Sequence, residues 1–201
     1  MSALDRRETV ARLLRDRGET VVVAGLGNPC WDLAAAGDHD RNLYLWGAMG
    51  GSVPMALGLA LARPETPVLC LTGDGEMMMG VGALAVVAQS APANLSIVVL
   101  DNGEYGETGA QRAHTATGAD LAAIARGAGL AEAVTVRTAD ALEALCRALA
   151  AQGAGSGPGP RFAAVKVARG SGDKAAIADA VRDAAYNRVR LRGALGLGPD
   201  R

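Results

Sequence analysis

The sequence predicts an α/β fold in which a mainly parallel β-sheet lies between two layers of helices, a three-layer α/β/α sandwich. Short runs of consecutive apolar residues, such as 21–24 and 68–72, alternate along the chain with longer segments of helical periodicity. Strands that lack polar alternation are buried on both faces, as in a parallel sheet covered by helices on each side. Because crossovers between parallel strands are right-handed, all the strands are expected to end at one edge, where ligands bind.

The predicted elements follow one another in a regular order. Apolar residues recur at helical spacing in six segments, which are 4–17, 51–63, 78–90, 119–128, 139–151 and 173–190. Short, largely apolar runs predict five strands, at 21–24, 68–72, 96–100, 132–136 and 162–168. Glycine and proline predict irregular structure at 25–29 and 153–160. We therefore expect a single domain over 1–190, followed by a flexible tail over 191–201.

The composition excludes several classes of protein. Half of the 201 residues are hydrophobic, which excludes a disordered chain, and 20 basic against 21 acidic residues give a net charge of -1. Such a balance predicts neither nucleic-acid nor membrane-surface binding. No apolar stretch approaches the about 20 residues that span a bilayer, and the charged first 17 residues do not resemble a secretory signal. Three cysteines without C-x-x-C spacing predict free thiols and a cytoplasmic protein.

Two short polar motifs follow neighbouring predicted strands. Residues 73–75 read Gly-Asp-Gly, and residues 101–103 read Asp-Asn-Gly after the next strand. Because a single helix separates these strands, Asp74 and Asn102 are expected to lie close together at the binding edge. A carboxylate, an amide oxygen and a backbone carbonyl suit a hard cation such as Mg²⁺, which commonly shares substrate phosphates. Glycines beside a helix N-terminus leave room for a phosphate, so the pattern predicts a metal-bridged diphosphate site.

Other interpretations of these motifs remain open at this level. Gly-Asp-Gly and Asp-Asn-Gly are ordinary turn sequences, and Asp or Asn after a strand often caps the next helix. Residues 25–27, Gly-Leu-Gly after a strand, partly match a dinucleotide fingerprint, although Cys30 stands where its third glycine belongs. A nicotinamide-binding module is therefore an alternative.

The same residues resemble a known family. Gly73-Asp74-Gly75, then a helix and a strand, then the residues from Asp101 to Tyr105, resemble the thiamine-diphosphate signature. Together with residues 46–50 (WGAMG) and 105–111 (YGETGAQ), they are similar to the pyrophosphate-binding half of sulfopyruvate and phosphonopyruvate decarboxylases. The similarity extends over roughly residues 20–170. It implies the pyrophosphate-type thiamine-diphosphate-binding fold.

The resemblance also implies a role for each matching residue. Mg²⁺ would be bound by Asp74, by the side-chain oxygen of Asn102 and by the backbone carbonyl of Glu104. The Gly47 carbonyl would accept a hydrogen bond from the aminopyrimidine, and Met49 would be the apolar wedge beneath the bent cofactor. The full set implied to bind the cofactor is Gly25, Gly27, Asn28, Gly47, Met49, Gly73, Asp74, Gly75, Glu76, Asn102, Glu104 and Tyr105.

Met49, Gln111 and His114 are the implied catalytic residues, with Tyr105 beside the last two on the substrate side. Where many relatives have two asparagines this chain has Asp101-Asn102, and we take Asn102 as the ligand. Glu104 and Glu107 make the loop acidic, so binding a sulfonate or phosphonate would require positive charge from Arg112 or from a partner.

The implied activity is that of a thiamine-diphosphate-dependent lyase, a decarboxylase that releases CO₂ and an aldehyde from a small 2-oxo acid. In the family, a separate pyrimidine-binding domain contributes the glutamate that activates the cofactor. The 201 residues accommodate one such sandwich, and Glu76, Glu104 and Glu107 lie at the metal end. We therefore expect a partner subunit that supplies this glutamate in a hetero-oligomer. A carboligase that transfers the acyl unit and a non-catalytic scaffold subunit with the same fold are the alternatives.

Overall fold

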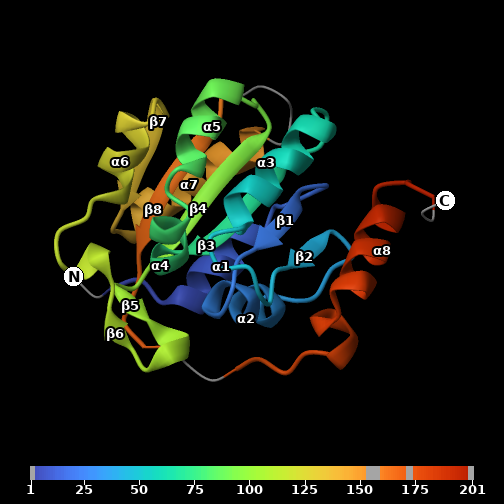
Figure 1. The fold of residues 1–201 in the computed structure, drawn as a ribbon, viewed down its shortest axis with the longest axis horizontal. Helices are drawn as coiled ribbons and strands as arrows, with labels where there is room; N and C mark the ends of the chain where they lie inside the picture. Colours follow the sequence, from blue (N-terminus) through green and yellow to red (C-terminus); the bar gives the residue numbers. More distant parts are fainter. Residues whose placement is uncertain (1–2, 153–158, 171–173, 199–201) are drawn as a thin grey trace.

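The computed structural model describes residues 3–152, 159–170 and 174–198. Its centre is a six-stranded sheet in the order β2-β1-β3-β4-β8-β7 (Figure 1). Every neighbouring pair is parallel. The strands are β1 (Val21–Ala24), β2 (Asn42–Tyr44), β3 (Val68–Gly73), β4 (Leu95–Asp101), β7 (Glu132–Val136) and β8 (Arg161–Lys166). The predicted α/β sandwich with a mainly parallel sheet is confirmed.

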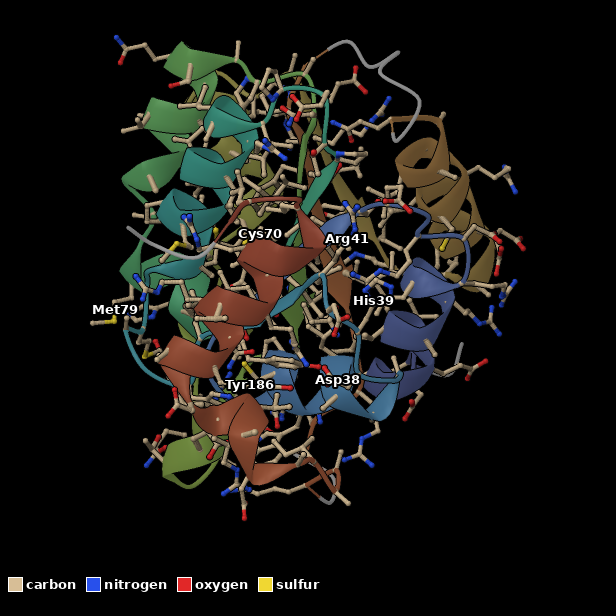
Figure 2. The ribbon with its side chains drawn as sticks, turned by 90° about the vertical axis from the view of Figure 1, so that its right-hand side faces the viewer. Asp38, His39, Arg41, Cys70, Met79 and Tyr186 are labelled. Atoms are coloured by element: carbon tan, nitrogen blue, oxygen red, sulfur yellow. The ribbon has the colours of Figure 1, made fainter. Side chains whose placement is uncertain are left out.

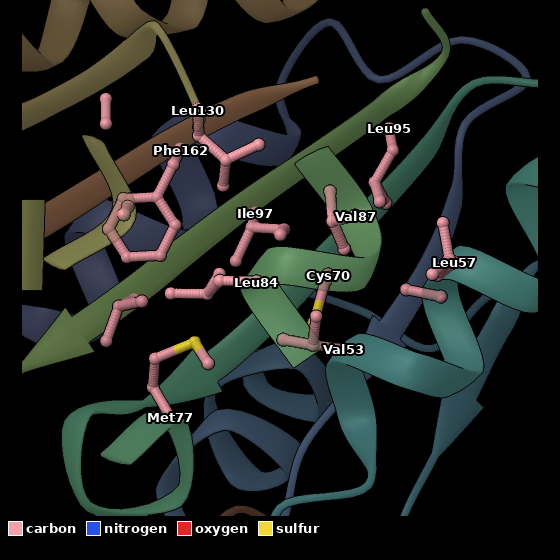
Figure 3. Close-up of a cluster of buried hydrophobic side chains, with 14 of the residues drawn as sticks. Val53, Leu57, Cys70, Met77, Leu84, Val87, Leu95, Ile97, Leu130 and Phe162 are labelled. Carbon is pink, nitrogen blue, oxygen red and sulfur yellow. The ribbon is translucent and has the colours of Figure 1, made fainter. Parts of the chain in front are cut away.

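Helices cover both faces of this sheet. One layer contains α1 (Arg6–Leu14), α2 (Asn28–Ala35) and α7 (Ala139–Gln152), and the other contains α3 (Ser52–Ala62), α4 (Asp74–Met79), α5 (Ala83–Ser90) and α6 (Leu121–Gly127). Strand β4 faces both cores, because Ile97 packs in the cluster around Phe162 shown in Figure 3 whereas Val98 packs in the cluster beneath α1 and α7. All seven residues of β4 are buried. Its continuous apolar run thus has the cause that the sequence predicts, burial on both sides.

The register brings the two polar motifs to the same edge. Strands β3 and β4 pair from Val68 with Leu95 to Gly73 with Leu100, so the two strands end side by side. Asp74 follows the last residue of β3, and Asn102 follows the last residue of β4. Parallel pairing alone therefore places the two side chains in neighbouring turns.

Several elements differ from the prediction. Residues 28–35 form α2, where 25–29 was predicted to be a loop, and the short strand β2 was not predicted. The helix predicted over 78–90 is two helices, α4 and α5, and the first of them begins already at Asp74. A hairpin of β5 (Glu104–Tyr105) and β6 (Gln111–Arg112) follows β4, with single 3-10 turns at Gly106–Thr108 and His114–Ala116. The predicted irregular segment 153–160 lies largely outside the described residues.

The helix predicted over 173–190 is confirmed only from Ala184 onward. Residues 174–178 contain no helix, a 3-10 turn spans Asp179–Arg182, and α8 spans Ala184–Ala194. Asp183 begins α8 by accepting a hydrogen bond from the backbone N–H of Tyr186 at 2.9 Å. The first residues of the predicted tail belong to this helix, in which Leu191 is buried. Asp173, the expected first residue of the helix, lies outside the described residues.

The C-terminal segment runs past α2 and ends against the edge strand β2 (Figures 1 and 2). The indole N–H of Trp46 donates to the Val181 carbonyl at 2.9 Å, and Arg190 of α8 pairs with Asp38 at 2.5 Å. These contacts hold α8 along β2, so the edge of the sheet next to β2 is covered by the chain's own helix. Among the helices of the described residues, none combines the length and the apolar character that crossing a lipid bilayer demands.

Candidate functional site

A pocket opens at the carboxyl edge of the sheet, where β1, β3 and β4 end. It has a volume of about 130 Å³. The residues around it come from the β1–α2, β3–α4 and β4–β5 turns, from the loop that precedes α3, and from the start of α1. They are Arg6, Leu26, Gly27, Asn28, Pro29, Met49, Gly73, Asp74, Gly75, Glu76, Leu100, Asn102, Glu104, Tyr105, Gly106, Glu107 and Thr108. We call this space the edge pocket.

Asp74 is a buried acidic residue of the edge pocket. Its side chain follows β3 at the first position of α4, and the residue is 1% exposed. The Thr115 hydroxyl donates to its Oδ2 at 2.5 Å. Burial raises the pKa of the Asp74 carboxyl, the Thr115 hydrogen bond opposes this rise, and the nearby charge of Asp101 adds to it. Because water cannot solvate the charged form of this carboxylate, a neighbouring cation would stabilise it.

Asn102 lines the edge pocket, whereas Asp101 does not. The Oδ1 atom of Asn102 accepts a hydrogen bond from the Glu104 backbone N–H at 3.0 Å, which fixes the turn between β4 and β5. Asp101 is 2% exposed and forms an ion pair with Lys166 of the neighbouring strand β8. The two side chains thus have different surroundings, and the one that shares a pocket with Asp74 is Asn102.

Two helices begin at the edge pocket. Helix α4 starts at Asp74, and α2 starts at Asn28 after Gly27, whose φ of 79° is in the left-handed region that favours glycine. Neither helix has a side-chain cap at its N-terminus. The first N–H groups of a helix have no partner within the helix, and they carry the positive end of its dipole. In α2, Pro29 has no N–H and the Cys30 N–H donates to the Gly27 carbonyl at 3.0 Å, so Asn28 is the residue of its first turn that can offer a backbone donor to an anion. The start of α4 can offer further donors from the other side of the pocket.

The ionisable side chains around the edge pocket are mostly acidic. Four acidic residues, Asp74, Glu76, Glu104 and Glu107, line it against one arginine, Arg6. Arg6 is buried and forms an ion pair with Asp32, which is inaccessible to solvent. The two acidic residues at the mouth have cationic neighbours from the segment after β8: Arg169 lies 3.8 Å from Glu104, and Lys174 lies 3.6 Å from Glu107.

Arg112, one expected source of positive charge, does not line the edge pocket. Its side chain is on the exposed hairpin and donates to the Ala116 carbonyl at 2.9 Å.

The hairpin places Tyr105 over the pocket, and the exposed His114 lies next to Tyr105. Tyr105 pairs with Gln111 across the hairpin, and its hydroxyl lies 3.1 Å from Nδ1 of His114. A Cβ added at Gly75 would come within 2.4 Å of the Tyr105 ring, so the ring lies directly over the β3–α4 turn. Gln111 and His114 do not line the pocket themselves. They contact it through Tyr105 and Thr108.

Two more residues expected to bind cofactor, Gly25 and Gly47, are not part of the pocket wall. Gly25 lies just behind it, because a Cβ there would come within 1.8 Å of the Glu76 carboxylate. Arg6 and Thr115, by contrast, were not predicted as site residues from the sequence. No local pattern marks either residue, since each reaches the site through contacts between distant segments.

No group of three or more His, Cys, Asp or Glu side chains with metal-binding spacing occurs within the described parts of the chain. The ligand set predicted from the sequence has one carboxylate, an amide oxygen and a backbone carbonyl, and so does not require such a group. A larger cavity of about 300 Å³ lies at the opposite edge of the sheet, between α1, α7 and the starts of β1, β3 and β4. It contains none of the predicted site residues.

Comparison with known proteins identifies the family. The family described as thiamine pyrophosphate enzyme, C-terminal TPP binding domain, matches residues 36–165. The chain belongs to this family. The sulfopyruvate decarboxylase subunit beta of Methanothermobacter thermautotrophicus is 37% identical over 170 residues, which is 85% of each chain. A phosphonopyruvate decarboxylase of Streptomyces viridochromogenes is 38% identical over 154 residues, 76% of this chain and 37% of that protein.

Solved structures agree on the fold. The thiamine diphosphate-dependent 4-hydroxybenzoylformate decarboxylase of Rhodococcus jostii RHA1 superposes with a TM-score of 0.64 at 21% identity, over 85% of this chain and 33% of that one. The chain thus spans about a third of the length of relatives such as this enzyme and the Streptomyces decarboxylase. It spans most of the length of the subunit beta. The expected resemblance to the pyrophosphate-binding part of these decarboxylases is confirmed.

Proposed function

We propose that this chain is the thiamine-diphosphate- and Mg²⁺-binding subunit of a heteromeric 2-oxo acid decarboxylase, a cytoplasmic lyase that releases CO₂ and an aldehyde. The observation that carries the proposal is that Asp74 and Asn102 line one pocket, at which two helices begin. This arrangement suits a divalent cation that is shared with a diphosphate.

The donors of the edge pocket fit a magnesium ion. Asp74 contributes a carboxylate and Asn102 an amide oxygen, and the backbone carbonyl of Glu104 completes a set of hard oxygen ligands. The excess of acidic residues also favours a bound cation. Four acidic residues and one arginine line the pocket, and a diphosphate would be repelled there unless a cation offset the negative charge.

The glycine turns fit the diphosphate. At Gly73 the nearest atom to an added Cβ is 4.0 Å away, so a phosphate can approach the backbone at this point. The N–H groups of Gly75 and Glu76 at the start of α4, and the turn of Gly27 and Asn28 at the start of α2, are the proposed donors.

The loop before α3 is proposed to hold the aminopyrimidine end. Met49 is 36% exposed at the mouth of the pocket, and its neighbours Ala48 and Gly50 have φ angles of 56° and 88°. A non-glycine residue in the left-handed region is uncommon and indicates a constrained loop. In our proposal Met49 is the wedge, and the Gly47 carbonyl accepts from the amino group.

Bound thiamine diphosphate supplies an electron sink for the loss of CO₂ from a 2-oxo acid. The substrate side is assigned to Tyr105, Gln111 and His114. The contact between Tyr105 and His114 fixes the imidazole beside the pocket mouth, where it can hold or transfer a proton. Arg169 and Lys174 offset the charges of Glu104 and Glu107, which permits an anionic substrate to approach.

A pyrimidine-binding partner subunit is proposed to supply the activating glutamate, so that the enzyme is a hetero-oligomer. The name subunit beta of the Methanothermobacter relative supports a partner. Exposed apolar side chains support one as well, because Met49, Met55 and Met79 are 36%, 45% and 68% exposed in and around α3 and α4. Figure 2 shows Met79 projecting from the surface. Exposed methionines are common at surfaces that bind other proteins.

The test is a reconstitution. We would co-express the chain with the product of the adjacent gene and screen 2-oxo acids, including sulfopyruvate and phosphonopyruvate, for CO₂ release with thiamine diphosphate and Mg²⁺. The proposal predicts release by the complex, an aldehyde product, and none from the chain alone or from a complex with Asp74→Asn. Turnover by the chain alone would refute the proposal that a partner subunit supplies the activating glutamate. Carboligation products in place of an aldehyde would assign an acyl-transferring enzyme, and a complex that binds no cofactor would indicate a scaffold subunit.

A further inference from the structure

The side chain of Glu76 has no part in the proposed binding of the cofactor, for which only its backbone N–H is used. The residue is 4% exposed and lies in the first turn of α4. A carboxylate that is nearly inaccessible to solvent costs free energy unless its oxygens are hydrogen-bonded. Its partners therefore show what the side chain does.

Both oxygens of Glu76 have partners on other elements. Oε1 accepts from the backbone N–H of Ser52 at 3.3 Å, and Oε2 accepts from the Thr72 hydroxyl of β3 at 3.0 Å. Ser52 is the first residue of α3, which has Gly51 at its N-cap and no hydrogen bond from a capping side chain. Glu76 therefore supplies from α4 the cap that α3 lacks within its own sequence, and its carboxylate faces the positive end of the α3 dipole.

The chain makes room for this carboxylate at Gly25. A Cβ at that position would come within 1.8 Å of Oε2 of Glu76. Gly25 does not have a positive φ, so its backbone conformation alone does not require glycine. The close approach of Glu76 does.

The cap holds the end of a constrained loop. Residues 47–51 run directly into Ser52, and within them Ala48 and Gly50 have positive φ angles. The loop also packs tightly on α4, because a Cβ at Gly80 would come within 2.5 Å of the Gly50 carbonyl. Such a conformation persists only where the surroundings fix it. The hydrogen bond from Ser52 to Glu76 is one of the fixing contacts.

We propose that Glu76 is a positioning residue that caps α3 across space and thereby holds loop 47–51, with Met49, in place beside the β3–α4 turn. The consequence for the cofactor rests on the proposed function, in which Met49 is the wedge. The capping itself is a property of the chain alone, so the two can be tested separately.

The first measurement is hydrogen–deuterium exchange of the full chain without cofactor. In Glu76→Ala the Ser52 amide loses its acceptor, and we expect residues 47–53 to exchange about tenfold faster. Glu76→Gln keeps an oxygen that accepts from Ser52 and an amide that can donate to the Thr72 hydroxyl, so exchange should stay within about twofold of the wild type. Glu143→Ala, at a half-exposed carboxylate on α7, is the control and should leave this segment unchanged.

Gly25→Ala provides an independent test. Its methyl group would displace the Glu76 carboxylate, so this variant should reproduce the faster exchange of Glu76→Ala. The double variant should be no worse than the more affected single variant, because both act through one contact. Unchanged exchange in Glu76→Ala, or effects of the two substitutions that add, would overturn the proposal.

The second measurement is made on the complex with its partner. Glu76→Ala should weaken the binding of thiamine diphosphate about tenfold and lower kcat, and Glu76→Gln should restore both to within about twofold of wild type. If Glu76→Gln is as defective as Glu76→Ala, the charge of the carboxylate is required, and the positioning role is refuted. If the wild-type complex binds no thiamine diphosphate, the proposed function fails, while the exchange result still decides whether Glu76 caps α3.

Discussion

Replacing Asp74 with asparagine should separate metal binding from folding. Asparagine keeps the shape of the side chain and an oxygen that accepts from the Thr115 hydroxyl, which lies 2.5 Å from the carboxylate. It removes the charge and replaces the second carboxylate oxygen by an NH2 group. Because burial raises the pKa of Asp74, the charged form costs free energy in the folded chain. We therefore expect Asp74→Asn to change the free energy of unfolding of the cofactor-free chain by less than about 1 kcal/mol, or to increase it.

Binding should respond far more strongly. Asp74 is the only charged side chain among the three proposed metal ligands, and loss of a supporting group even one shell further out costs about 10–100-fold in metal affinity. We expect Asp74→Asn to weaken Mg²⁺-dependent binding of thiamine diphosphate by at least about 100-fold, or about 2.7 kcal/mol.

The assay is a calorimetric titration of the complex with thiamine diphosphate at several Mg²⁺ concentrations, with urea unfolding of the chain in parallel. Thr115→Val is a useful companion, because it removes the hydrogen bond to Asp74 but leaves the carboxylate in place. If Asp74→Asn retains Mg²⁺-dependent affinity, Asp74 is not a metal ligand. If it destabilises the chain by more than about 3 kcal/mol, its role is structural and the reasoning from burial is refuted.

Three further predictions concern titration, thiol reactivity and packing. Because the folded pKa of Asp74 is raised, Mg²⁺-dependent binding should weaken as pH falls through that raised pKa. The contribution of this group to the stability of the cofactor-free chain has the opposite sign: it is fully present below the unfolded pKa and is lost as pH rises through the folded one. Cofactor affinity with Mg²⁺ and the free energy of unfolding of the cofactor-free chain would both be measured from pH 4 to pH 8. If both quantities rose or both fell with pH, the opposite signs expected for Asp74 would be contradicted. Burial raises the pKa of the Cys30 and Cys70 thiols, so a thiol reagent at pH 8 should modify the half-buried Cys146 alone in the folded chain, and mass spectrometry that finds either buried thiol modified would contradict this burial. Phe162→Ala removes a side chain that is 1% exposed in the cluster of Figure 3, and urea unfolding should show a loss of about 3–5 kcal/mol; a loss below about 1 kcal/mol would show that this cluster adds little to stability.

The fold was predictable where burial produces a recognisable hydrophobic pattern in the local sequence. Strands β1, β3, β4 and β8 appear as largely apolar runs, because both of their faces are covered. The edge strand β7 differs, because its buried Ala133 and Val136 alternate with the exposed Glu132 and Val134. Strand β2 has only three residues, Asn42–Tyr44, and no such run. Helix α2 was missed because Gly27, Asn28 and Pro29 read as a turn, although proline is tolerated in the first turn of a helix and here starts one.

The C-terminal segment was mispredicted for a different reason. Ile177, Val181 and Ala185 have helical spacing, but the helix begins only after Val181, at Ala184. The Val181 carbonyl accepts from Trp46, far away in the sequence. Contacts of this kind override a weak local preference for helix and leave no mark in the segment itself.

The same distinction applies to the site. The turns with Asp74 and Asn102 were predictable, because each directly follows a recognisable strand and the strands are neighbours. The hydrogen bond from Thr115 to Asp74 joins residues 41 positions apart, and that from Ser52 to Glu76 joins residues 24 apart. Nothing in the spacing of these residues shows that their side chains meet, so only the folded chain reveals what surrounds each carboxylate.

The most direct test of the account is a crystal structure of the complex grown with thiamine diphosphate and Mn²⁺ in place of Mg²⁺, because Mn²⁺ can be located by its anomalous scattering. We expect a single strong anomalous peak in the edge pocket, bonded to the Asp74 carboxylate and the Asn102 amide oxygen and shared with the diphosphate. A cofactor bound with its phosphates elsewhere, or a manganese peak away from these two side chains, would contradict the account.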